Sequence, residues 1–189
     1  METVDDSNLN GFALNRYFDF NTALIEFHNL FNKEIVDERA VAILGGTFLE
    51  MALEHILRAY LPEGEKEVNG LFETNGPMAT FSNKISLCFC LGLIDVVIKD
   101  DLTLVRKIRN RFAHDLYATF SNDQIKSWSD ALSFHTISMM MKAPKGATSL
   151  QIFQVGVNQL ISHLHGCIGM SSKEKREIKR DLSHFKLKT

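Results

Sequence analysis

The stretch ERAVAILGGTFLEMALEHILRAYL, residues 38–61, decides the fold that this sequence predicts. Its apolar residues recur at spacings of three and four, which is the period of a helix with one buried face. Asp37 precedes it with a side chain suited to cap a helix, and Pro62 follows it, where a helix must end. Gly45 and Gly46 lower its helix propensity by about 1 kcal/mol each. Small residues here predict the close approach of another helix, within the subunit or across a dimer seam.

The same helical period continues on both sides of this stretch. We expect one helix before it, a loop directly after it and several further helices, and no segment shows the alternation of a β-strand. The expected helices cover residues 10–32, 80–91, 95–116 or 101–116, 123–141, 148–168 and a charged terminal segment 171–185, and the loop covers 62–77. The sequence therefore predicts an all-α, single-domain bundle of six or seven helices.

Length and composition agree with a folded domain of this kind. The chain has 189 residues, of which 45% are hydrophobic and 23% charged, enough for one buried core and short for two. We divide it into an N-terminal extension, residues 1–25, a helical domain, residues 26–143, and C-terminal helices with a basic tail, residues 144–189, that pack on the same domain. The tail segment 173–188 carries seven basic and three acidic residues, which suits either a phosphate-contacting arm or a solvated helix.

Charge and cysteine content exclude several classes of protein. A net charge of −2 argues against a surface that coats nucleic acid as a whole. The acidic N-terminus is unlike a signal peptide, and we find no apolar run of the ~18 residues that span a bilayer, so we expect no membrane partner. Cys88, Cys90 and Cys167 form an odd set without metal-site spacing, which predicts buried free thiols and a cytoplasmic location. We expect neither a metal nor a cofactor.

The segment VRKIRNRFAH, residues 105–114, is the most informative for function. On a helix with ~100° per residue, its apolar positions gather into one stripe that faces the core. The stripe consists of Leu102, Val105, Ile108, Phe112 and Leu116, and beside it lie Arg106, Arg109, Asn110, Ala113 and His114. Arg109 and His114 are ~140° apart around the helix and ~7.5 Å apart along it. They would converge on one ligand only where two copies of the helix meet across a twofold axis.

This arrangement has a functional and a structural interpretation. A phosphate-binding site would use Arg106, Arg109, Arg111 and His114, because guanidinium groups match phosphate oxygens and histidine transfers protons near neutral pH. Asn110 would hold the imidazole or the phosphate. In the structural interpretation, the basic residues stabilise the C-terminal end of the helix dipole, and His114 caps the last carbonyls. Arg109 would then pair with a carboxylate of another helix, supplied by Glu38, Glu50 or Glu54.

Three separated blocks of the chain resemble the mannitol operon repressor (MltR-like) family. The blocks are EIVDERAVAILGGTFLEMALEHILRAYL (34–61), GPMATFSNKISLCFCLGLI (76–94) and LVRKIRNRFAHDL (104–116), and the resemblance extends over about residues 30–135. The third block is also similar to the signature of the wider HEPN superfamily, which here places Arg109 and Asn110 before His114. The resemblance to HEPN proteins implies a HEPN-like helical bundle that forms a homodimer and brings two arginine–histidine pairs into a shared cleft.

What the resemblance implies about function leaves two hypotheses. The first is a dimeric regulatory protein of the transcriptional repressor or co-repressor type that acts through protein partners. We do not expect sequence-specific DNA binding by the chain alone, since no helix-turn-helix pattern is present. The alternative is a metal-independent endoribonuclease of a toxin or defence system with RNA as its partner. In that enzyme His114 would be the general acid and base, Arg109 would stabilise the phosphate, and Asn110 would orient one of them.

Overall fold

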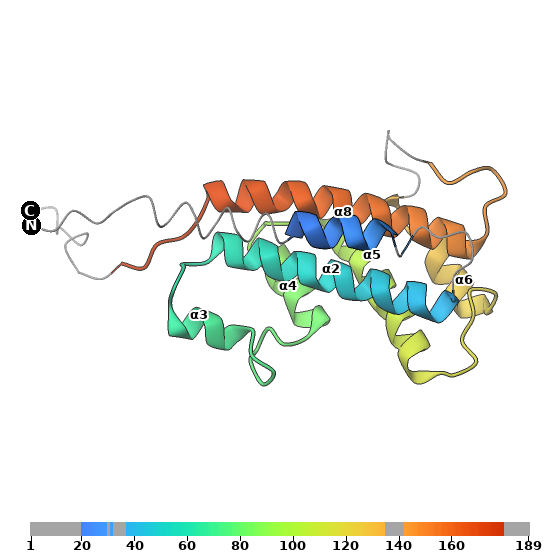
Figure 1. Ribbon diagram of the computed structural model, residues 1–189, viewed down its shortest axis with the longest axis horizontal. Coiled ribbons are helices and arrows are strands. Elements are labelled where there is room, and N and C mark those ends of the chain that lie inside the picture. Colours follow the sequence, from blue (N-terminus) through green and yellow to red (C-terminus); the bar gives the residue numbers. More distant parts are fainter. Residues whose placement is uncertain (1–19, 30, 32–36, 135–141, 180–189) are drawn as a thin grey trace, which may run out of the picture.

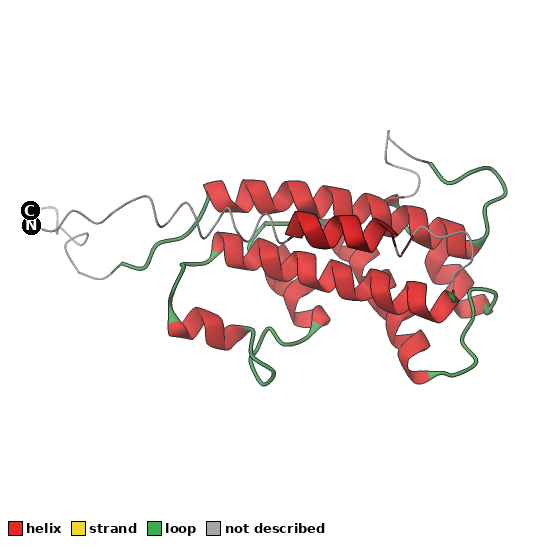
Figure 2. Ribbon diagram, in the orientation of Figure 1, coloured by secondary structure: helices red, strands yellow, loops and turns green. Residues whose placement is uncertain are grey.

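The computed structural model describes residues 20–29, 31, 37–134 and 142–179, and in these ranges the chain forms helices and no strands (Figures 1 and 2). Residues 20–29 are helical, and the bounds of the later helices are α2 Glu38–Tyr60, α3 Lys66–Leu71, α4 Phe81–Cys90, α5 Val96–His114, α6 Asp123–Asp130 and α8 Ser149–Lys173. The all-α prediction is confirmed.

Helix α2 lies at the centre of the bundle and packs against α8, α5 and α4. It begins where the sequence predicts, because the Asp37 side chain accepts hydrogen bonds from the backbone N–H groups of Arg39 and Ala40. It ends at Tyr60, before Pro62. Helices α2 and α8 run side by side (Figure 1). Their C-terminal ends lie together, since the backbone N–H of Arg176 donates to the carbonyl of Tyr60 at 2.7 Å.

Gly45 and Gly46 permit close packing on both sides of α2. A Cβ atom at Gly45 would lie 3.0 Å from the ring of Phe31 and 3.3 Å from Val157 of α8. A Cβ atom at Gly46 would lie 2.8 Å from Cγ of Arg109 on α5. In the part of the chain described, the close approach that these glycines predict is therefore made within the subunit.

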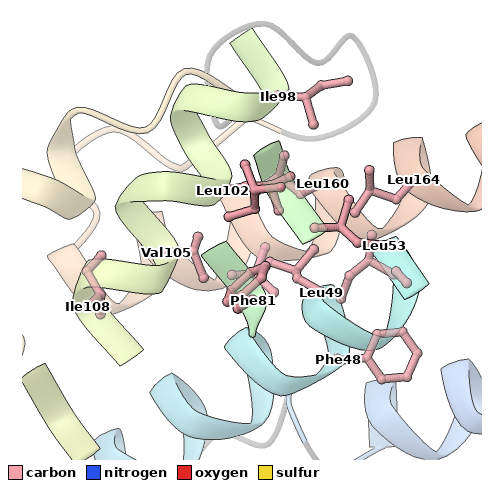
Figure 3. Packing of buried hydrophobic residues seen from close by; sticks show 14 of the residues in the cluster. Phe48, Leu49, Leu53, Phe81, Ile98, Leu102, Val105, Ile108, Leu160 and Leu164 are labelled. Carbon is pink, nitrogen blue, oxygen red and sulfur yellow. The ribbon is translucent and has the colours of Figure 1, made fainter. Parts of the chain in front are cut away.

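The apolar stripe of α5 forms one wall of the core. Leu102, Val105 and Ile108 face Leu49 and Leu53 of α2, with side chains of α8 nearby (Figure 3). Burying each such side chain contributes on the order of 1.5–3 kcal/mol. Four of the five predicted stripe residues are fully buried, namely Leu102, Val105, Ile108 and Phe112.

The fifth predicted stripe residue, Leu116, is not part of the core. Helix α5 ends at His114, and Asp115 at its C-cap has an extended backbone with φ −120° and ψ 112°. The helical period therefore no longer applies at Leu116, whose side chain is 84% exposed. The prediction that it packs in the core is wrong.

The end of α6 differs from the sequence prediction because of a contact between residues that are distant in sequence. The helix predicted over residues 123–141 ends at Asp130, and residues 131–133 are not helical. The buried carboxylate of Asp101 accepts hydrogen bonds from the backbone N–H groups of Ser133 and Phe134 at 2.9 and 2.8 Å. These bonds compensate the buried charge and hold the chain in a non-helical turn.

The C-terminal part also departs from the prediction. Helix α8 continues through Gly169 to Lys173, and residues 174–179 are not helical. There the guanidinium of Arg176 donates to the hydroxyl of Tyr60 at 2.6 Å, and Lys175 pairs with Glu63. The loop predicted over residues 62–77 contains the short helix α3. The remaining parts of three predicted helices, residues 10–19, 135–141 and 180–185, lie outside the described residues.

Helix α2 has 23 residues, and an 18-residue window of it has a mean hydropathy of 1.5, so by length and composition alone it is long and apolar enough for a membrane span, which the sequence analysis did not expect. Just over half of that span, 56%, is buried inside the structure. The central helix of a folded bundle has the same composition, because it is apolar on several faces. The apolar character of α2 is accounted for by its packing against α8, α5 and α4.

The cysteines differ in exposure, which corrects one further expectation. Cys88 and Cys167 are buried, whereas Cys90, at the end of α4, is exposed. Burial, together with the nearby Cys167, raises the pKa of Cys88 to about 12, and burial raises the pKa of Cys167 above its usual value. Because the thiolate is the reactive form, the two buried thiols are unreactive in the folded protein.

Thiol labelling tests this packing. In the native protein we expect a maleimide reagent at neutral pH to modify Cys90 and to leave Cys88 and Cys167 unmodified, as read by peptide mass spectrometry. All three should react once the chain is unfolded in urea. Equal native labelling of Cys88 and Cys90 would contradict the buried position of Cys88 on α4.

Candidate functional site

The predicted site residues lie on different sides of α5. Arg109 points toward α2, whereas His114 is the last helical residue and is exposed together with Ala113. Asn110 and Arg106 are half-buried, and Arg111 is exposed and forms an ion pair with Asp115 at 2.9 Å. The structure thus does not bring Arg109 and His114 together within the subunit, as the 140° separation on a helix predicts.

Arg109 is committed to an ion pair inside its own subunit. Its Nη2 atom lies 2.8 Å from Oε2 of Glu50 on α2, and the pair is mostly buried, with side-chain exposures of 26% and 19%. The stem of Arg109 crosses α2 at Gly46, and its guanidinium carbon lies 5.8 Å from the ring centre of Phe81 on α4. Glu50 is one of the three carboxylates that the structural interpretation of the motif named.

Glu50 belongs to a larger charged cluster on one side of α2. Lys84 of α4, with a side chain only 8% exposed, lies 3.4 Å from Oε1 of Glu50 and 3.1 Å from Oε2 of Glu54. Glu54 in turn accepts a hydrogen bond from Nε of Arg58 at 2.8 Å. We call these five residues, Glu50, Glu54, Arg58, Lys84 and Arg109, the Glu50 cluster. It links α2, α4 and α5 through paired charges.

A cavity of about 340 Å³ borders this cluster. Its lining consists of Thr47, Glu50, Met51, Glu54, His55, Arg58 and Lys84. The two carboxylates there are already paired with cations, so the lining offers no carboxylate that is available as a general base. Within the described ranges no group of three histidine, cysteine or acidic side chains is placed to hold a metal ion.

The pKa of Glu54 is lowered by its two cationic partners in the Glu50 cluster. Burial alone would raise the pKa of this carboxyl, but hydrogen bonds from Arg58 and Lys84, aided by their charges, outweigh it. The pKa therefore lies below its usual value of 4.5. The cationic partners of Glu54 therefore favour its ionised form more than burial disfavours it.

The C-terminal end of α5 is held by Arg39, which the sequence analysis did not single out. One nitrogen of its guanidinium donates to the carbonyl of Phe112, and Nη2 donates to the carbonyl of Asp115 at 2.8 Å. Arg39 thus satisfies terminal carbonyls and places a positive charge at the negative end of the helix dipole. This is the capping that the structural interpretation assigned to His114.

Two signals in the sequence indicate the residues that were missed. Lys84 is the one charged residue of α4, FSNKISLCFC, and a lone cation in an apolar helix requires a partner when it is buried. Arg39 sits in the first turn of α2, where the helix dipole disfavours a positive charge. Such a residue is expected to have a partner elsewhere, but the sequence does not say which.

Comparison with known proteins supports the fold. No protein-family model matches the chain, and no curated protein matches its sequence. Among solved structures, the chain is similar to the X-ray structure of the MtlR-HPr complex from Escherichia coli. The TM-score is 0.54 with 19% sequence identity, over 82% of this chain and 99% of that chain. At this identity the comparison establishes a shared helical fold.

Removing the shared carboxylate should destabilise the bundle. Glu50→Gln leaves Lys84 and Arg109 without their common counter-charge, and we expect the free energy of unfolding to fall by about 1–3 kcal/mol. Urea unfolding followed by circular dichroism measures this. The matched control is Glu73→Gln, an exposed residue, for which the loss should stay within about 0.5 kcal/mol. Equal stability of the two variants would show that the ion pairs of Glu50 contribute nothing net.

Acid should weaken the same cluster. Because the pKa of Glu54 is lower in the folded state than in the unfolded state, its contribution is complete above the unfolded value of 4.5 and is lost as the pH falls through the folded value. Unfolding free energies measured from about pH 6 to about pH 3 should therefore fall less steeply in Glu54→Gln than in the original protein. Parallel curves for the two proteins would contradict the lowered pKa.

Proposed function

We propose that the protein is a non-enzymatic, cytoplasmic regulatory protein of the transcriptional repressor or co-repressor type, which acts through a protein partner. One observation carries the proposal. The guanidinium of Arg109 is bound to Glu50 at 2.8 Å, while His114 lies exposed on another side of α5. The two side chains do not meet within one subunit, and the arginine that would stabilise the phosphate already has a structural partner.

The shared fold supports a role in regulation. The similarity covers 99% of the matched chain, and the structure that contains it is a complex of MtlR with the protein HPr. By analogy we propose that this chain also binds another protein and transmits regulation through it. We further propose that the protein is a homodimer, as the family resemblance implies. A fold hosts many functions, so the analogy is a hypothesis about the site and needs a direct test.

The ribonuclease alternative requires an arginine that contacts the scissile phosphate. For Arg109 to do so, it would have to leave Glu50, and the carboxylate would then remain beside Lys84 with one fewer cation. Opening such a pair costs free energy, because a partly buried charge loses its compensation. We found no contact in the described residues that favours this alternative over the regulatory role.

A complementation experiment separates the two hypotheses. The gene is deleted, and transcript levels are compared after re-expression of the original protein or of His114→Gln. We expect the deletion to change transcripts of a small set of operons and both proteins to restore them, since the imidazole is exposed and takes no part in the proposed regulation. Glutamine preserves size and hydrogen bonding but does not transfer protons, so a ribonuclease would lose its activity.

The outcomes are distinct. Cyclic-phosphate RNA ends that depend on the original protein and vanish with His114→Gln would refute the regulatory proposal in favour of the enzyme. Unchanged transcripts after deletion, together with no protein retained by the purified chain at near-physiological salt, would refute it without supporting the enzyme. The oligomeric state, measured by analytical ultracentrifugation, tests the homodimer separately.

A further inference from the structure

The turn that follows α5 displays two large apolar side chains to solvent. Leu116 is 84% exposed and Tyr117 is 87% exposed, the two highest values among the large hydrophobic residues described. Single exposed apolar residues are common on protein surfaces. Here two adjacent residues are both almost fully exposed, and the backbone that carries them is held in a defined turn.

This turn is fixed by several hydrogen bonds. The carboxylate of Asp115 accepts from the backbone N–H of Tyr117 at 2.9 Å, and its carbonyl accepts from Ala118 N–H at 3.2 Å and from Arg39. On the far side, Ala118 and Phe120 are buried in the core. The backbone that carries Leu116 and Tyr117 is therefore ordered before any partner binds, which lowers the entropy cost of association.

Two cations of α5, Arg106 and Lys107, have no carboxylate partner in the described parts of the chain. Arg106 has no hydrogen bond or ion pair within the described parts of the chain, and the ammonium of Lys107 has only a distant ring contact, 5.9 Å from the centre of Trp128. The two cations begin about 12 Å along the helix from its C-terminal end. That distance is well within the span of a typical protein interface of about 800 Å² per partner.

Several acidic groups close to the C-terminal end of α5 are engaged, but Asp123, in the first turn of α6, is exposed and has no ion pair among the described residues. Asp115 pairs with Arg111, and Glu38 accepts a hydrogen bond from the backbone N–H of Phe120 at 2.8 Å. Asp37 caps α2. Arg106 and Lys107 together exceed Asp123 by one positive charge, so the excess charge of these free groups is positive.

We propose that Leu116, Tyr117, Arg106 and Lys107 form a docking surface, the α5 surface, for a protein partner that presents an apolar pocket beside carboxylates. Tyr117 fills the pocket, since tyrosine combines a large apolar body with a polar tip and dominates many interfaces. The two cations meet the acidic groups and guide the approach. The inference rests on the proposed function, because it names where the partner of the regulator binds.

Charge argues against a second copy as the occupant. A twofold axis close to Arg106 and Lys107 would bring them near the same residues of the other copy, and like charges across an interface are unfavourable. RNA is disfavoured because two uncompensated cations provide few phosphate contacts. Leu116 and Tyr117 would also have no apolar partner on RNA. Both remain as outcomes of the test.

The test places a photoreactive benzoyl-phenylalanine at position 117 of the full chain in the source cell. The matched control carries it at position 170, where Met170 is also exposed, at 59%, near the C-terminal end of α8. The two positions lie at opposite ends of α2, since Arg39 contacts Asp115 and Arg176 contacts Tyr60. We expect irradiation to attach one particular protein to position 117 and not to position 170.

That protein is then purified and its affinity for the unmodified chain is measured. We expect Tyr117→Ser to weaken binding at least tenfold, Met170→Ser to leave it unchanged, and the double variant Arg106→Glu, Lys107→Glu to slow association about tenfold at low salt but little at high salt. Lys107, Tyr117 and Met170 are exposed and Arg106 is half-buried, so circular dichroism of each variant checks that the fold is unchanged.

Four results would overturn the inference. They are adducts of position 117 with a second copy of the chain, adducts with nucleic acid, no adduct at position 117, and a partner whose affinity does not change in Tyr117→Ser. In the last case the proposed function stands and only the surface is wrong. If the purified chain binds no protein at all and its deletion leaves transcripts unchanged, the proposed function fails as well.

Discussion

A carboxylate shared between two cations holds three helices of this bundle in place. Glu50 of α2 binds Lys84 of α4 through one oxygen and Arg109 of α5 through the other. Charges taken out of water must be compensated, so α4 and α5 can shift along α2 only by breaking a pair. Apolar packing supplies most of the stabilisation, but it is non-directional. The Glu50 cluster adds the directional contacts that fix how the helices align.

Most helix boundaries could be predicted because their causes are local. Asp37, Thr80 and Asp95 each cap the helix that follows them with a side-chain oxygen, and such residues are legible in one sequence. The predictions failed where a distant partner decides the backbone. Residues 131–133 leave the helix because Asp101 binds the chain there, and residues 174–179 are not helical where Arg176 binds Tyr60. Neither partner is adjacent in sequence.

The candidate site could also be predicted only where local helical geometry decides it, and not where a distant residue does. Helical geometry placed Arg109 at the edge of the core stripe and separated it from His114, and both features are present. It left Glu38, Glu50 and Glu54 as possible partners, because choosing among them requires the crossing point of two helices. The hydrogen bond from Arg39 to the carbonyl of Phe112 joins residues that are 73 positions apart, so no local sequence pattern predicts it. The basic segment of α5 therefore divides into a structural part, which faces α2, and an exposed part.

The position of Gly46 one helical turn before Glu50 has a consequence for comparing sequences. The glycine leaves space for the stem of Arg109, and the carboxylate four residues later receives its guanidinium. A chain with a side chain at position 46 has no room for that path, since a Cβ atom there meets the arginine at 2.8 Å. A glycine followed four residues later by a glutamate on the central helix therefore indicates an arginine that packs across this helix and pairs with the glutamate. Sorting homologous chains by this pattern would separate those that use the arginine for folding from those in which it is available for chemistry.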